Sequence, residues 1–166
     1  MKSTFDEPMA HTQMLIRKPV AQVFEALLDP SITSRFWFSK GSGRLEPGRR
    51  IHWDWEMYGH HTEVDVKEIE ANKRILIEWN GPDNPSSVEW TFEAKGGDRT
   101  LVKVKNWGFG SGDENKTIAE AINSSGGFSF VLAAMKVFLE HGIEPNIVVD
   151  HDPDAHVGNW ATGRAA

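Results

Sequence analysis

The sequence contains no cysteine and has one tyrosine among its 166 residues. Without cysteine the chain can hold no disulfide framework, no thiol nucleophile and no zinc site built on thiolates. It also lacks the run of roughly 18 apolar residues that identifies a membrane-spanning helix, and residues 1–8 lack the apolar segment of a secretion signal. We therefore expect a cytoplasmic protein without stable membrane association.

Basic residues are too few to form a surface that binds nucleic acid. The chain has 18 Lys and Arg against 24 Asp and Glu, which gives a formal net charge of -6. A protein that neutralises phosphates needs clustered positive charge, and this sequence shows no such cluster. We expect no nucleic acid among its partners.

Motifs for metal binding and catalysis are also missing. The histidines and acidic residues form neither a His-x-x-x-His pair nor a calcium-binding loop, and the glycine-rich stretch over residues 108–112 is too short for a dinucleotide fingerprint. There is no Gly-x-Ser-x-Gly elbow. Carboxylates such as Asp54 and Glu78 alternate with apolar residues, which is typical of the solvated face of a sheet. We expect no metal, no cofactor and a binding protein rather than an enzyme.

Aromatic residues are abundant, with seven Trp and nine Phe, and many stand in segments that alternate between apolar and polar positions. This alternation is typical of strands with one buried face. It predicts a meander of antiparallel strands, after a first strand over residues 11–18, at residues 50–56, 62–68, 75–79, 88–92 and 100–107. Ile69 breaks the alternation and marks either a bulge or a strand end.

Helical spacing predicts the remaining elements. Apolar residues recur at three- and four-residue steps over residues 20–28 and, most clearly, over residues 128–141, where Gly142 supplies a left-handed C-cap. Residues 31–38 predict a second short helix. The spacing over residues 114–123 predicts a further short helix. Gly126 and Gly127, which follow it, either break this helix or start the main helix.

The predicted order is β-α-α-β-β-β-β-β-α, an α+β fold. The simplest packing lays the helix over residues 128–141 across the concave face of one curved antiparallel sheet, and a helix held in this way makes a pocket. We divide the chain into a flexible arm over residues 1–10, one domain over residues 11–142 and a tail over residues 143–166.

Several short motifs along this order resemble those of the START-like, or SRPBCC, superfamily. Within it they are most similar to the branch named after the C-terminal domain of the Aha-type activator of the heat-shock chaperone ATPase. The motifs are Ile16-Arg-Lys-Pro-Val20, Val23-Phe-Glu-Ala-Leu27, Asp29-Pro30, Phe36-Trp37, Leu45-Glu-Pro-Gly48, Glu68-Ile-Glu70, Arg74-Ile75, Glu78-Trp79, Gly108-Phe109 and Gly127-Phe128. The resemblance covers about residues 12–142 and implies a helix-grip fold, in which the long C-terminal helix closes a cavity for an apolar ligand.

On this resemblance, the residues that face the helix or close the ends of the sheet would line the cavity. They are Trp37, Trp53, Trp55, Ile77, Trp79, Trp90, Phe92, Val104, Asn106, Phe109, Phe128, Leu132 and Met135. Asn106 is the polar member of this set, and we place His60 or His61 near it as a second polar contact. The alternative for each apolar member is a place in a filled core.

The sequence leaves three functions open, because members of the superfamily include lipid carriers, polyketide cyclases and chaperone activators. The leading prediction is binding of an apolar or aromatic small molecule, lipid-like or polyketide-like. One alternative is a polyketide cyclase or aromatase in which Asn106 or a nearby His moves a proton. The other is a chaperone-activating interaction domain, although the chain has no counterpart of the activator's partner-binding domain. Exposed rings such as Trp37 or Trp160 would serve a homodimer or a ligand gate.

Overall fold

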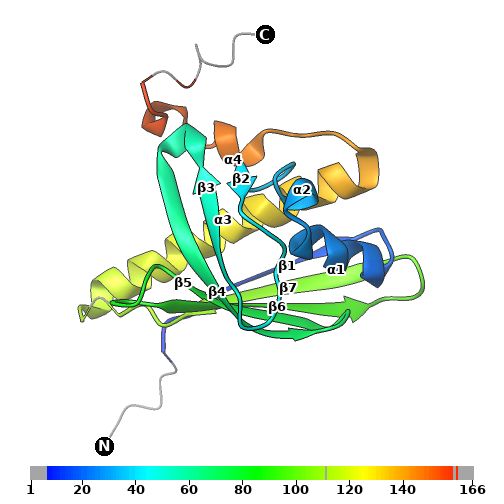
Figure 1. Cartoon of the computed structure of the whole chain (residues 1–166), viewed down its shortest axis with the longest axis horizontal. Helices are drawn as coiled ribbons and strands as arrows, with labels where there is room; N and C mark the ends of the chain where they lie inside the picture. Colours follow the sequence, from blue (N-terminus) through cyan, green and yellow to red (C-terminus); the bar gives the residue numbers. More distant parts are fainter. Residues whose placement is uncertain (1–6, 111, 159, 161–166) are drawn as a thin grey trace, which may run out of the picture.

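The computed structural model describes residues 7–110, 112–158 and 160 (Figure 1). Its strands are β1 (Ala10–Ile16), β2 (Lys40–Gly41), β3 (Arg50–Trp55), β4 (His60–Glu70), β5 (Arg74–Trp79), β6 (Ser86–Ala94) and β7 (Thr100–Trp107). In this part of the chain they form one seven-stranded antiparallel sheet in the order β1-β7-β6-β5-β4-β3-β2. The sheet curves but does not close, since β1 and β2 lie at opposite edges (Figure 1). The predicted α+β fold is confirmed, with β2 as a short strand that the sequence did not predict.

The alternation of apolar and polar residues directs one face of this sheet inwards. In β3, Ile51, Trp53 and Trp55 are buried, while His52 between them is partly exposed. The antiparallel register places Ile51 opposite Val64, which is buried as well. Residues paired directly across two strands share a face, so the inward sets of neighbouring strands meet in one core.

β4 contains an irregularity near Ile69, where the broken alternation predicts either a bulge or a strand end. Its register with β5 shifts between Val66 and Glu68, and pairing then continues through Ile69 to Glu70. An extra residue in one strand bends that strand and increases its twist. The irregularity is therefore a bulge within β4 rather than its end.

Two short helices, α1 (Val20–Leu28) and α2 (Pro30–Thr33), follow β1. α1 buries its apolar stripe in the core, as its spacing predicts. α2 is shorter than the helix predicted over residues 31–38, so that prediction was wrong beyond Thr33. The three aromatic residues 36–38, which follow α2, are buried in the core.

One long helix, α3 (Glu114–His141), runs across the concave face of the sheet (Figure 1). It joins the short helix predicted over residues 114–123 to the main helix predicted over residues 128–141. The glycines between them continue the helix and do not break it. Gly142 ends α3 with a left-handed φ of 68°, the C-cap that the sequence predicts.

The two halves of α3 have different surroundings. The second half is a core element, with buried side chains at Phe128, Val131, Leu132, Ala134 and Met135. In the first half Thr117 and Ala121 are buried, but Ile122 is 66% exposed. By length and composition alone α3 is apolar enough to cross a membrane. Its second half instead packs against the sheet as a helix of the domain core.

The described part of the tail packs on the domain. It contains α4 (Ile147–Asp150) and the 3₁₀ turn η2 (Pro153–Ala155). The tyrosine at the end of the 3₁₀ turn η1 (Glu56–Tyr58) donates its Oη–H to the carbonyl oxygen of Val148 at 2.6 Å. This bond attaches the tail to the connection between β3 and β4.

The division of the chain into arm, domain and tail stays a prediction. Within the arm predicted over residues 1–10, residues 1–6 lie outside the described residues, and β1 begins at Ala10. Within the tail predicted over residues 143–166, positions 159 and 161–166 lie outside them as well.

Candidate ligand cavity

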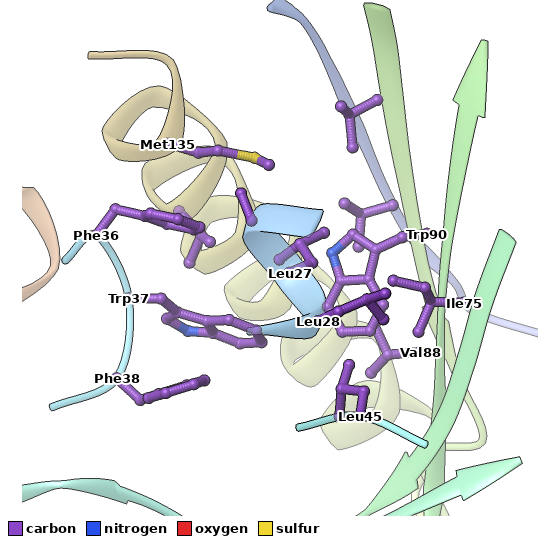
Figure 2. Packing of buried hydrophobic residues seen from close by; sticks show 14 of the residues in the cluster. Leu27, Leu28, Phe36, Trp37, Phe38, Leu45, Ile75, Val88, Trp90 and Met135 are labelled. Carbon is purple, nitrogen blue, oxygen red and sulfur yellow. The ribbon is translucent and has the colours of Figure 1, made fainter. Parts of the chain in front are cut away.

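Aromatic rings fill the centre of the space between the sheet and α3. We call these rings the aromatic cluster, which consists of Trp37, Phe38, Trp53, Trp55 and Trp90. The Trp37 ring lies 5.0 Å from that of Trp53 and 5.9 Å from that of Trp90, measured between centroids. Figure 2 shows Trp37 reaching from the connection after α2 into the core, towards Trp90 of the sheet. Rings at these distances are in contact, so the cluster packs this region tightly.

Most residues predicted to line a cavity lie in this packed core. Besides the tryptophans of the aromatic cluster, the buried side chains are Ile77, Phe92, Val104, Leu132 and Met135. They do not line the cavity described next, and a contact between them and a ligand stays a prediction. Trp37 is 6% exposed, so the expectation that its ring is exposed was wrong.

A cavity of about 370 Å³ opens at one end of the same space. It lies where β5 and β7 end and β6 begins, next to the first half of α3. The residues that line it are Trp79, Asn80, Asn84, Ser86, Asn106, Gly108, Phe109, Glu120, Asn123, Ser124, Gly127 and Phe128. Of the residues predicted from the sequence, Trp79, Asn106, Phe109 and Phe128 belong to this lining.

The apolar part of the lining is made of aromatic rings. Trp79 at the end of β5 stacks on Phe128 of α3, with 5.8 Å between centroids and 28° between ring planes. Phe109 follows Gly108, whose φ is 88°. An added Cβ at Gly108 would lie 3.4 Å from Ser86 Cα, so glycine allows the loop after β7 to approach the start of β6.

The polar part of the lining is fixed by hydrogen bonds. Asn106, on β7, is 2% exposed. Its Nδ2 donates to the carbonyl oxygen of Ser87 at 2.8 Å, and its Oδ1 accepts from Ser124 Oγ at 2.7 Å. These bonds hold the amide in one orientation and connect β6, β7 and α3. Asn106 therefore positions the lining and has no titratable group with which to move a proton.

Sequence reasoning missed Ser86, the first residue of β6. It is 2% exposed, and its Oγ accepts hydrogen bonds from Trp79 Nε1 at 2.9 Å and from Asn80 Nδ2 at 3.1 Å. The signal was present, because Ser86 stands two residues before Val88 and so shares its inward face. The missed residues on α3 and in the loops, among them Glu120 and Asn123, had no comparable signal.

His60 and His61 lie outside this cavity. They border a separate, open hollow together with Thr62 and Asn80, and Asn80 lines the cavity as well. Burial lowers the pKa of His60, and the charge of neighbouring His61 lowers it further. Among the residues that the structure describes, no group of three or more His, Asp or Glu side chains is arranged to hold a metal ion. A polar contact from His60 or His61 to a ligand stays a prediction.

The open sheet, the long helix across it and the cavity between them define a START-like, helix-grip protein. The chain belongs to the family described as Activator of Hsp90 ATPase homolog 1-like protein, whose model matches residues 17–140. No curated protein sequence matches the chain.

Solved structures agree on the fold. Protein SSP2350 from Staphylococcus saprophyticus is 27% identical, with a TM-score of 0.69 over 81% of this chain and 93% of that one. The Aha1 dimer from Colwellia psychrerythraea is 16% identical, with a TM-score of 0.68 over 81% and 97% of the two chains. DynU16, from the dynemicin biosynthetic locus, is 20% identical, with a TM-score of 0.71 over 82% of this chain and 49% of its own.

Proposed function

We propose that this protein binds an apolar or aromatic small molecule, lipid-like or polyketide-like, in the cavity beside the first half of α3. It acts as a carrier or receptor and does not transform the ligand. The cytoplasmic location expected from the sequence is part of this proposal.

The observation that carries the proposal is a cavity of about 370 Å³ with aromatic walls and a fixed polar side. Small-molecule sites in proteins enclose roughly 300–1,000 Å³ and combine mostly apolar walls with a few placed polar groups. Trp79, Phe109 and Phe128 supply the rings. The hydrogen-bonded Asn106 and Ser86 are two of the polar side chains, and the others are Asn80, Asn84, Glu120, Asn123 and Ser124. The lining thus has the composition of a site for a flat, largely apolar molecule.

The cyclase or aromatase alternative needs a group that moves a proton. Among the described residues that line the cavity, Glu120 is the one with an acidic or basic side chain, and it is exposed. Asn106 is held by Ser87 and Ser124, and the histidines border a different hollow. These placements favour binding over catalysis.

The test is a titration with N-phenyl-1-naphthylamine, a neutral dye whose emission rises in an apolar site. We expect saturable one-to-one binding and a rise in melting temperature, because a ligand at about 100 times its Kd stabilises the folded state by about 2.7 kcal/mol. No saturable binding with an unchanged melting temperature would contradict the proposal and favour an interaction domain of the kind that activates a chaperone.

Two adjacent glycines of α3 provide matched variants. Gly127 lines the cavity and Gly126 does not, and an added Cβ at either position meets no heavy atom within 4 Å. Gly127→Leu places its side chain in the cavity and should lower dye affinity at least about tenfold, by the loss of roughly 1.4 kcal/mol. Gly126→Leu should leave the affinity unchanged. Equal affinities in the two variants would place the dye elsewhere.

A homodimer is a further part of this proposal. The Aha1 protein from Colwellia psychrerythraea is a dimer in its solved structure. In this chain Met9, Ile118 and Ile122 are exposed on or beside the first half of α3. Sedimentation equilibrium would show a dimer for the natural chain and a monomer for Ile122→Glu. A natural chain that sediments as a monomer at all concentrations would remove this part of the proposal.

A further inference from the structure

The start of β6 carries a buried hydroxyl group on which three N–H donors converge. Ser86 lines the cavity and is 2% exposed. Its Oγ accepts from Trp79 Nε1 at 2.9 Å, from Asn80 Nδ2 at 3.1 Å and, more weakly, from Asn106 Nδ2 at 3.4 Å. Among the described residues that line the cavity, no other hydroxyl group accepts hydrogen bonds from three N–H donors.

This arrangement determines where the Ser86 proton points. A serine hydroxyl has two lone pairs and one proton. The three donors approach the oxygen on the side of its lone pairs. An N–H group cannot accept a hydrogen bond, so none of the three can accept the Ser86 proton. None of the described residues accepts the Ser86 O–H. The proton therefore points into the cavity that Ser86 lines.

Buried polar groups in native proteins are nearly always paired, so an O–H that no described residue accepts calls for an acceptor inside the cavity, which a ligand can supply. Donors to the oxygen also polarise the O–H bond and make it a stronger donor. The neighbouring acceptor, Asn106 Oδ1, already receives the Ser124 hydroxyl. This side of the cavity thus offers a donor and suits a group that accepts without donating, such as a carbonyl oxygen.

We infer that Ser86 is the specificity-determining donor of the cavity and that the ligand is a flat aromatic molecule with a carbonyl oxygen at its inner edge, such as an aryl ketone or a quinone. The inference rests on the proposed function, since it needs a ligand in this cavity. Trp79, Phe109 and Phe128 would contact the rings, while Ser86 selects the oxygen.

The test compares 9-fluorenone with fluorene, which has nearly the same shape and a CH₂ group in place of the carbonyl. Isothermal titration of the full chain should show fluorenone binding about three to ten times more tightly, the factor expected for one added hydrogen bond. The C=O stretching band of bound fluorenone should lie at lower wavenumber than in an alkane solvent, because the bond to Ser86 weakens it.

Three variants assign this preference to Ser86. Ser86→Ala should bind the two probes within about twofold and return the C=O band towards its alkane position. Ser86→Thr keeps the hydroxyl and should keep the preference. Ser87→Ala, whose side chain is on the opposite face of β6, should behave as the natural chain. Should Ser86→Ala not fold, the probe pair and the C=O band on the natural chain decide the inference alone.

The outcomes separate the inference from the function on which it rests. Equal affinity of the natural chain for both probes, with an unshifted C=O band, overturns the role of Ser86 and leaves the binding function intact. A full ketone preference in Ser86→Ala overturns it too. Binding of neither probe to the folded natural chain contradicts the proposed function and the inference together.

Discussion

Two tryptophan side chains in this core have opposite surroundings. Trp90, in the aromatic cluster, is 1% exposed, and its Nε1–H has no hydrogen-bond partner among the described residues. Trp79, at the end of β5, donates its Nε1–H to Ser86 Oγ and lines the cavity. The centre of the space between sheet and helix is thus filled by rings, and one end of it is polar and open. Aromatic content alone does not mark the pocket in this fold, since tryptophans occupy both the filled and the open part of this space.

The largest change in the free energy of unfolding is expected for the aromatic cluster in the filled centre. Trp37→Ala removes the ring at the middle of the aromatic cluster and should lower the free energy of unfolding by about 3–5 kcal/mol, because it leaves a cavity that the packed neighbours cannot fill. Urea unfolding followed by circular dichroism measures this change. Trp37→Phe, which keeps a ring, should cost clearly less. Equal and small losses of unfolding free energy in both variants would mean that the aromatic cluster is not tightly packed.

The next effect concerns the polar side of the cavity. Asn106→Asp places a carboxylate oxygen where Nδ2 now donates to the Ser87 carbonyl, and should cost about 1–3 kcal/mol at pH 7. Burial raises the pKa of such a carboxyl in the folded state, so its protonated form is favoured and the loss should shrink as the pH falls from 7 towards 4. Urea unfolding at several pH values checks this. A loss that does not depend on pH would show that position 106 is open to water.

A smaller change in the free energy of unfolding, in this case an increase, is expected where α3 passes the cavity. Gly126→Ala and Gly127→Ala should each raise the free energy of unfolding by about 0.5–1 kcal/mol, since glycine disfavours the helix and an added Cβ meets nothing within 4 Å. Thermal unfolding of both variants measures the gain. A loss of stability in either variant would indicate that α3 is not a regular helix at this point.

The smallest effect concerns the hollow beside the cavity. Burial lowers the pKa of His60 in the folded protein. As the pH falls below the unfolded value of about 6.5, the unfolded chain therefore takes up a proton that folded His60 resists, and stability decreases. His60→Gln should flatten this decrease between about pH 7 and 5 without changing dye affinity. An altered dye affinity would instead bring His60 into the ligand site.

The fold followed from the sequence because its signals are local and agree with one another. Alternation along β3 and helical spacing in α3 each identify a buried face, and Gly142 identifies the end of the helix. The sequence could not decide the path through Gly126 and Gly127, because a double glycine is compatible with a break and with a continuous helix.

Only part of the cavity lining could be predicted from the sequence. The alternation identifies the inward face of each strand, but it does not show how completely side chains fill the space in front of that face. Trp53 and Trp79 both occupy inward strand positions, yet Trp53 belongs to the aromatic cluster and Trp79 lines the cavity. Both rings also pack against Trp37, which enters the core from a connection outside the sheet, with centroids 5.0 Å from Trp53 and 6.1 Å from Trp79. Such a long-range placement has no signature in the alternation.

The most direct test of the account is a heteronuclear NMR titration of the indole N–H groups with N-phenyl-1-naphthylamine. We expect a saturable shift that is largest for Trp79 Nε1–H, which is hydrogen-bonded to Ser86 at the cavity, and small for Trp53 and Trp90 in the aromatic cluster. Larger shifts for Trp53 and Trp90 than for Trp79, or none that saturate, would contradict a filled centre beside an open ligand cavity.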